Sequence, residues 1–152
     1  MKKWLVILAL ALPVACLTPA HAQDYNTAVS VNIGADMGFS FKHFVGEHGA
    51  FEAQFGYNIP CDGVMLSAVY QYHVPLAQGF NFYAGGGLNI GALHLGRPHE
   101  NADFAIGIDP TIGFEYKFNT APIALAVDYK PNINFTVHSQ WSVAEFKVRY
   151  TF

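Results

Sequence analysis

Histidine and acidic residues that could hold a metal ion gather in two stretches of the chain. His94, His99, Glu100 and Asp103 lie within ten residues, and His138 stands 35 residues further along. Imidazole and carboxylate groups are suitable ligands for Zn²⁺ or Cu²⁺. Their spacing matches no standard metal site, however, and polar loops collect such residues by chance. The sequence therefore predicts no metal site and no cofactor.

Two further patterns suggest enzyme chemistry only superficially. His138 and Ser139 are adjacent, but a base and a nucleophile must be aligned in space, which adjacency does not provide. Residues 85–87 are three consecutive glycines, but no lysine follows them and no helix is expected there, so they do not form a phosphate-binding loop. The sequence predicts no catalytic residues and a protein that is not an enzyme.

The elements that must position these residues begin after an N-terminal export signal. Residues 1–3 are a short basic start, residues 4–14 are an apolar run, and residues 20–22 have the small-x-small form of a signal-peptidase site. We therefore expect residues 1–22 to be a cleaved signal peptide. Residues 23–152 are then long enough for one domain.

Cleavage at this site would change both the charge and the cysteine content. It would remove Lys2, Lys3 and Cys16 and leave six basic residues against 11 acidic ones. Cys61 would then have no partner for an intramolecular disulfide, so a thiol without a role is expected there. The alternative is a lipoprotein acylated at Cys16, which is disfavoured because Pro13 occupies a position where lipoprotein signals carry an aliphatic residue.

The composition of the chain is unusual for a water-soluble protein. Among its 152 residues, 52% are hydrophobic, 15% are aromatic and only 12% are charged, about half the usual charged share. This balance excludes a disordered chain, and the acidic net charge of −3 argues against a nucleic-acid binder. Beyond residue 22 no stretch of 18 consecutive apolar residues could form a transmembrane helix. A closed β-barrel is the other architecture that can span a membrane.

Alternation of apolar and polar residues recurs along the chain and predicts β-strands. In the last segment Phe146, Val148 and Tyr150 share one face, whereas Lys147 and Arg149 share the other. Eight such segments are expected, and an even number lets an antiparallel barrel close. Their approximate ranges are residues 29–34, 39–42, 51–58, 64–73, 80–90, 106–118, 123–130 and 144–152. The fold class predicted is therefore all-β, an eight-stranded antiparallel up-and-down transmembrane barrel with a filled polar lumen.

Every second strand ends in aromatic residues with basic neighbours. In an up-and-down barrel these ends lie on one side, where they would form an aromatic girdle at the membrane interface. The predicted girdle, with the C-terminal aromatic residue, comprises Phe44, Tyr72, Phe118, Tyr150 and Phe152. The connections at these ends are short, whereas residues 93–103 and 131–141 form longer loops on the opposite side.

The polar faces of the same strands would enclose charges of both signs inside the barrel. Buried charges need partners, so we predict a salt-bridged plug whose role is structural. Eight strands are also too few for a wide pore. The predicted network comprises Lys42, Glu52, Glu115, Lys117, Asp128, Lys130, Glu145, Lys147 and Arg149, with Asp36 and Asp109 on the same face.

Taken together, these segments resemble the small eight-stranded outer-membrane β-barrel domain proteins of Gram-negative bacteria, which are similar to outer-membrane protein A-type barrels. The resemblance covers nearly all of residues 23–152. It implies a bacterial outer-membrane location, contact with outer-membrane lipid, and recognition of the terminal Phe152 by the barrel-assembly machinery. It also implies a structural or surface-interaction role, with an envelope or surface protein as a possible partner. The matching segments are residues 38–44, 70–73, 83–87, 113–118, 128–131 and 149–152.

Three alternatives remain open at the level of sequence. A lipid-modifying outer-membrane enzyme would need a serine–histidine pair near the lipid interface. A soluble lipocalin-like barrel would have the same alternation with apolar side chains inside, but the large aromatic residues are too many for a small cavity. A binding or adhesion role would use Arg97, Phe104, Phe135 and Trp141 near the outward loops, although Phe104 and Trp141 also suit an aromatic girdle.

Overall fold

The computed structural model describes residues 25–94, 103–141 and 143–152. The predicted signal peptide, residues 1–22, lies outside the described residues, as do His99, Glu100 and Arg97 of the longest loop. All regular structure in the described part of the chain is β-structure. No helix there is long and apolar enough to cross a membrane.

Ten β-segments follow one another along the chain. Most carry an apolar residue at every second position, which favours extended backbone with two chemically different faces. The segments are β1 (Thr27–Gly34), β2 (Asp36–Val45), β3 (Gly49–Asn58), β4 (Gly63–Ala77), β5 (Phe80–Leu93), β6 (Asp103–Ile108), β7 (Thr111–Lys117), β8 (Ile123–Tyr129), β9 (Ile133–Asn134) and β10 (Ala144–Thr151).

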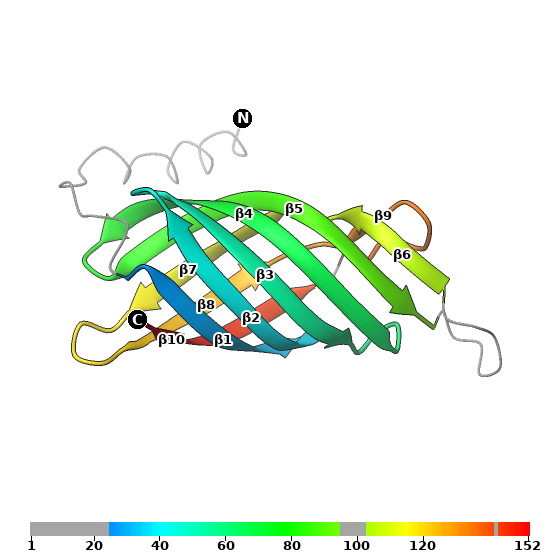
Figure 1. Ribbon diagram of the computed structural model, residues 1–152, viewed down its shortest axis with the longest axis horizontal. Coiled ribbons are helices and arrows are strands. Elements are labelled where there is room, and N and C mark those ends of the chain that lie inside the picture. The colour runs from blue at the N-terminus through cyan, green and yellow to red at the C-terminus, as the bar shows by residue number, and fades with distance from the viewer. Residues whose placement is uncertain (1–24, 95–102, 142) are drawn as a thin grey trace, which may run out of the picture.

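These segments form one closed antiparallel barrel (Figure 1). Closure comes from the pairing of β1 with β10 and of β4 with β5. Two wall strands each consist of two segments. One is formed by β6 and β7, which both pair with β5 in a single alignment. The other is formed by β8, which pairs with β7, and β9, which pairs with β6. The prediction of an eight-stranded antiparallel barrel is therefore confirmed.

The two ends of the barrel differ in their connections. The turn end, on the left in Figure 1, holds the short turns at residues 46–48, 78–79 and 118–122. Gly46 and Gly79 have φ angles of 83° and 76°, a left-handed conformation that glycine adopts at no steric cost. The loop end, on the right, holds the tight β1–β2 turn at Ala35, the turn at residues 59–62 and the hairpin that follows β8.

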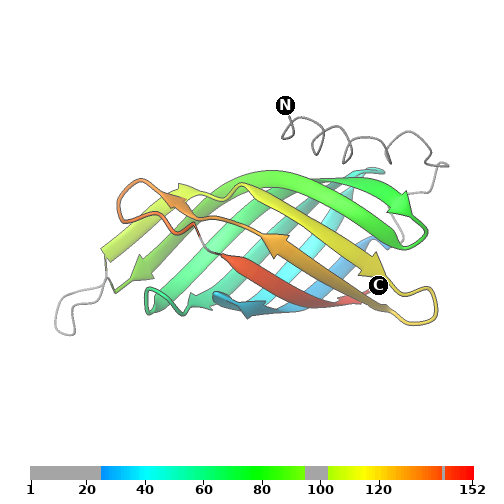
Figure 2. The same ribbon diagram turned by 180° about the vertical axis from the view of Figure 1, so that it is seen from behind.

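The wall has a continuous part and an interrupted part. The continuous wall comprises β10, β1, β2, β3 and β4, and apart from an irregularity between Pro75 and Ala77 its strand pairings run without a break. The interrupted wall comprises β5 to β9, in which both composite strands break at the same height, next to Pro110 and Pro131 (Figure 2).

Residues 131–141 are more ordered than the sequence predicts. Instead of a simple loop, Ile133 and Asn134 form β9 against β6, and Asn132 pairs with Gln140 to close a hairpin. The reason is that the backbone of β8 resumes its strand pairing beyond Pro131. The hairpin carries Gln140 back to the loop end of the barrel interior.

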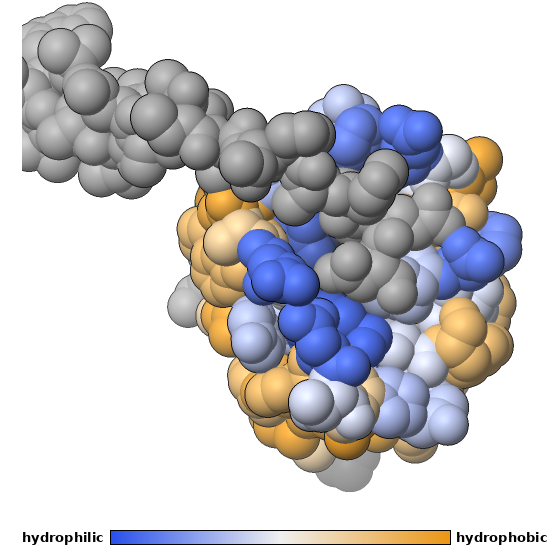
Figure 3. Space-filling model, turned by 90° about the vertical axis from the view of Figure 1, so that its left-hand side faces the viewer, coloured by the Kyte–Doolittle hydropathy of each residue, from blue (hydrophilic) through white to orange (hydrophobic). Residues whose placement is uncertain are grey.

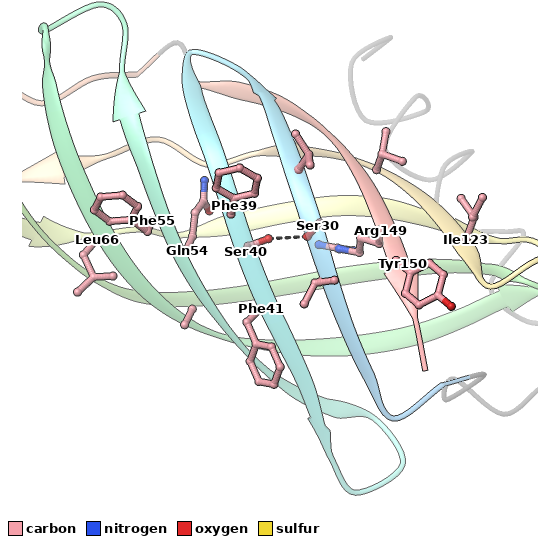
Figure 4. Close-up of a pocket in the computed structure, with 14 residues that line it drawn as sticks. Ser30, Phe39, Ser40, Phe41, Gln54, Phe55, Leu66, Ile123, Arg149 and Tyr150 are labelled. Atoms are coloured by element: carbon pink, nitrogen blue, oxygen red, sulfur yellow. Dashed lines mark hydrogen bonds between the residues drawn. The ribbon is translucent and has the colours of Figure 1, made fainter.

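The outer face of the barrel is apolar. Phe39, Phe55 and Leu88 are among the most exposed residues of the strands, with 57–68% of their surface accessible. Figure 3, viewed from the turn end, shows hydrophobic residues around the flanks and more hydrophilic residues on the end face. An apolar hollow of about 730 Å³ lies on this outer face over β1 and β2, with the rings of Phe39, Phe41 and Tyr150 around it (Figure 4).

Candidate functional site

The interior of the barrel is a connected network of ion pairs, and its centre is Arg149 on β10. Its guanidinium donates to Glu52 on β3 at 2.8 Å and to Glu115 on β7. All three side chains are at most 1% exposed. Arg149 thus joins strands from both walls, as its planar array of donors permits.

Two lysines extend the network from this centre. Lys147 lies 2.6 Å from Glu52, 2.8 Å from Asp128 and 3.5 Å from Glu145. Lys42 lies 3.3 Å from Glu115. Each carboxylate near Arg149 therefore has a second cation, which offsets the cost of taking these charges out of water.

Toward the loop end, Lys130 continues the network. Its ammonium lies 3.5 Å from Glu145, 3.8 Å from Asp36 and 4.0 Å from Asp109. It also donates to the Gln54 amide oxygen at 3.0 Å, while the Gln54 amide nitrogen donates to Glu145 at 2.9 Å. The ion-paired groups thus run along the barrel axis from Lys42 to Asp36 without a gap.

Amide side chains close the network at the loop end. Asn58 donates to Asp36 at 2.5 Å and to the Gln140 amide oxygen at 2.8 Å, and Gln140 donates back to Asn58 at 3.2 Å. Gln140 also donates to the Cys61 sulfur at 2.7 Å. Asn132 donates to Asp36 at 3.4 Å. The hairpin after β8 therefore reaches across the mouth to the turn between β3 and β4.

Aromatic side chains fill the interior at the turn end. His73 stacks on Tyr83 with ring centroids 4.9 Å apart, and Phe44 lies 4.9 Å from His73. The Lys42 ammonium lies 4.9 Å from the Tyr83 ring, a distance at which a cation and an aromatic face attract. Tyr25 covers this group and donates to Glu115 at 2.8 Å. Rings and ion pairs therefore meet on the same strands.

Two residues assigned by sequence lie elsewhere. Phe44, predicted in the outward girdle, is only 4% exposed and points inward, since it stands two positions after the inward Lys42. Ala28 and Ala50 leave space for its ring inside the turn end. Lys117, predicted in the interior network, instead donates to the carbonyls of Phe118 and Ala121, because it ends β7 beside its own turn.

The other predicted positions agree with the inside-out arrangement. The remaining eight network residues are ion-paired inside the barrel at 2% exposure or less. Tyr72, Tyr150 and Phe152 are exposed by 52–62% and Phe118 is half-buried. Sequence reasoning missed the roles of Tyr25, His73, Tyr83, Asn58 and Gln140; His73 and Tyr83 do share the predicted polar face of their strands.

The loop residues considered for chemistry are not brought together in the described part of the chain. No group of three histidine, cysteine or acidic residues is placed there to hold a metal ion. The His94 ring bonds to the Asp62 carbonyl oxygen at 2.8 Å. The Ser139 hydroxyl contacts the backbone N–H of Asn134 at 3.2 Å and its carbonyl oxygen at 3.3 Å, not the ring of His138.

Comparison with known proteins gives a structural neighbour. The crystal structure of the N-terminal β-barrel domain of Pseudomonas aeruginosa OprF superposes with a TM-score of 0.71 and 15% sequence identity. The match covers 83% of this chain and 96% of that domain. No protein-family model matches the chain, and no curated protein matches it in sequence. At this identity the likeness establishes the barrel fold alone.

Proposed function

We propose that the protein is an integral β-barrel of the bacterial outer membrane, with a structural or surface-interaction role rather than a transport or catalytic one. The observation that carries the proposal is the reversed polarity of the wall. Lys147 and Arg149 are enclosed, whereas Phe146 and Val148, which alternate with them along β10, are each 39% exposed. A hydrocarbon solvent stabilises this arrangement, and water opposes it.

The closed backbone supports the same conclusion. Inside a bilayer no water is available to satisfy N–H and C=O groups, so a sheet must have no free edge. Pairing of β1 with β10 removes the edges here. A soluble ligand-binding barrel would need a polar exterior, and exposed rings such as Phe39, at 68% exposure, do not suit it.

The filled interior favours a closed barrel over an open pore. Ion pairs cross the lumen through Arg149, rings close the turn end, and Gln140 crosses the loop end. Outer-membrane lipid and the barrel-assembly machinery are the expected partners. Exposed Phe104, Phe135 and Trp141 near the loop end are suited to contact with a surface protein or with the headgroup region.

The membrane assignment can be tested by expressing the full chain in a Gram-negative bacterium and separating the membranes. We expect the protein in the outer-membrane fraction, with a faster-migrating band in unboiled than in boiled samples. The variant Val148→Asp places a charge on the outer face of β10 and should reduce recovery in that fraction. A periplasmic protein without a mobility shift would contradict the assignment.

The closed interior can be tested separately in planar bilayers. Purified barrel should give no stable ion-selective conductance in lipid where a reconstituted porin does. Steady conductance from the pure protein would contradict the plugged interior but leave the membrane assignment intact. Incubation with lipid A followed by mass spectrometry tests the remaining alternative, for which we expect unchanged acyl chains.

A further inference from the structure

Three asparagines and one aspartate of the interrupted wall lie next to one another on its inner face. Asn89 on β5 lies opposite Gly107 on β6, and Gly107 lies opposite Asn134 on β9. The same register, continued by two residues, places Asp109 opposite Asn132. The four polar side chains are exposed by 7% or less. Because glycine has no side chain, they surround a position that no side chain of β6 fills.

Each of the three amides is held through its nitrogen atom. The Nδ2 atoms donate from Asn89 to the Asp109 Oδ1 atom at 2.5 Å, from Asn132 to the Asp36 carboxylate at 3.4 Å, and from Asn134 to the His138 carbonyl oxygen at 3.3 Å. A flipped amide would place its oxygen against another acceptor, so these partners determine the orientation of each amide. The amide oxygens therefore point away from the partners of the nitrogens.

Four buried oxygens of this group have no hydrogen-bond donor among the described residues. They are the Oδ1 atoms of Asn89, Asn132 and Asn134 and the Oδ2 atom of Asp109. The Asn134 oxygen lies over the glycine, since a Cβ at Gly107 would be 2.9 Å from it. A buried acceptor without a partner destabilises the fold. A single cation can satisfy several such oxygens at once.

The charges of the interior also favour a cation at this place. Six carboxylates and four cationic side chains are buried in the described part of the chain. The Lys130 ammonium lies 4.0 Å from Asp109 Oδ2, but it lies closer to the Gln54 amide oxygen, at 3.0 Å, and to Glu145, at 3.5 Å. Asp109 therefore has room for a second cation, just as Glu52 is shared by two cationic side chains elsewhere in the network.

The backbone ladder has a gap beside this group. The Phe135 N–H donates to Ile106 at 2.8 Å, and the same register places Pro110 opposite Pro131, where antiparallel partners exchange two hydrogen bonds. Proline has no N–H, and so both bonds are absent. A cation held by the four oxygens would join the two wall strands next to this gap.

We propose that Asp109, Asn89, Asn132 and Asn134 form a Ca²⁺ site inside the barrel. Ca²⁺ takes about six to eight oxygen ligands and accepts amide oxygens, carboxylates and water together, whereas Mg²⁺ requires a regular octahedron and releases its water reluctantly. The group contains no histidine or cysteine, which Zn²⁺ and Cu²⁺ prefer. With one carboxylate among the ligands, we expect a Kd of about 1 mM.

The test measures Ca²⁺ binding to the purified protein in a neutral detergent, without lipid phosphate that would itself bind the ion. The protein is treated with EGTA, dialysed, and titrated with ⁴⁵Ca²⁺ in equilibrium dialysis. We expect one saturable Ca²⁺ site per barrel, with Mg²⁺ competing only at concentrations about tenfold higher or more. Ca²⁺ should also raise the unfolding temperature, because a ligand that binds only the folded barrel stabilises it.

Variants distinguish a local site from the overall charge of the interior. Asp109→Asn keeps the shape of the side chain and should weaken Ca²⁺ binding about tenfold or more, whereas Asn134→Asp adds a carboxylate and should strengthen it about tenfold. Asp128→Asn removes an equal charge next to Lys147, away from the site, and should leave the affinity unchanged. A mobility shift in unboiled samples confirms that each variant is folded.

Two results would overturn the proposal. Absence of saturable ⁴⁵Ca²⁺ binding to the unmodified protein would mean that water satisfies the four oxygens. Equal losses of affinity in Asp109→Asn and Asp128→Asn would mean that the ion responds only to the net charge of the interior. Neither result bears on the membrane assignment, which depends on the outer face of the wall.

Discussion

The continuous wall and the interrupted wall build the same kind of surface in different ways. In the continuous wall, β2 and β3 pair through ten successive residues of each strand. In the interrupted wall, two pairs between β6 and β9 and six between β7 and β8 flank a gap. Asp109 and Lys130 on the two sides of the gap are nevertheless both buried, although the alternation is interrupted at Pro131, which is buried between Lys130 and Asn132.

This difference separates the contribution of the backbone from that of the side chains. Where two ladder bonds are absent, the Lys130 ammonium lies 4.0 Å from the Asp109 carboxylate on the inner face of the same segments. An ion pair thus spans the gap in the ladder. The interior network, and not a complete ladder, keeps the two segments facing the lumen at this height.

The most severe test of the comparison is loss of the residue that joins the two walls. Arg149→Met leaves Glu52 and Glu115 with one fewer cation each, and we expect a loss of about 3 kcal/mol in the free energy of unfolding. Guanidinium unfolding in detergent micelles, followed by Trp141 fluorescence, measures this loss. The neighbouring outward variant Val148→Ala should cost about 1 kcal/mol or less. Equal losses in the two variants would mean that the ion pairs of Arg149 contribute no more to the free energy of unfolding than the outward side chain of Val148.

A smaller effect is expected where the interrupted wall accommodates a large inward ring. A Cβ at Gly113 would lie 2.6 Å from the Tyr83 ring, and Gly113→Ala should therefore cost about 2 kcal/mol. In the continuous wall, Gly56→Ala meets its nearest atom at 3.0 Å and should cost less. Unfolding of the double variant Gly113→Ala with Tyr83→Leu measures the coupling, which should be favourable. Additive costs would contradict the ring as the cause.

Restoring a ladder bond should make the local stability of the interrupted wall more similar to that of the continuous wall. Pro131→Val adds a donor opposite Pro110, and a new bond contributes about 1 kcal/mol. Hydrogen exchange at the Ile112 and Ile133 amides should slow several-fold in this variant. Exchange at Phe39 and Phe55 in the continuous wall serves as the internal control and should not change. Unaltered exchange at Ile112 would show that the missing bond does not limit local opening.

The smallest expected effect concerns the contact between the two walls at the loop end. Burial raises the pKa of the Cys61 thiol above its ordinary value, outweighing the Gln140 amide that donates to it. A raised pKa means less thiolate at a given pH, so alkylation by iodoacetamide should be slower than for free cysteine at pH 8. Its rate should continue to rise above the pH at which free cysteine levels off. A profile that coincides with free cysteine would place the thiol outside this contact.

Much of the barrel could be predicted because its signal is local. Period-two alternation assigns Val148 outward and Arg149 inward without knowledge of any partner strand. The same rule places the Phe44 ring inside with Lys42, whereas the aromatic pattern of the strand ends predicts an outward girdle position, which is wrong for this residue. The prediction for Lys117 was wrong for a different reason. The side chain of the last residue in a strand can donate to the carbonyl oxygens of the turn that follows, as Lys117 does.

The remaining features depend on which strands meet, which alternation does not reveal. Gln140 reaches Asn58 only because residues 132–140 form a hairpin at the barrel mouth. The opposition of Pro110 and Pro131 requires the register between two strands, and the stacking of His73 on Tyr83 requires the register between β4 and β5. A single sequence fixes neither register by itself.

The bond between Tyr25 and Glu115 has a consequence for the order of assembly. Tyr25 belongs to the part of the described chain made first, yet its partner is 90 positions later, and β1 itself needs β10. Contacts so distant in sequence form slowly, because the entropic cost of closing a long loop comes before the contacts stabilise the chain. One edge of β1 therefore stays unpaired during assembly until β10 is in place.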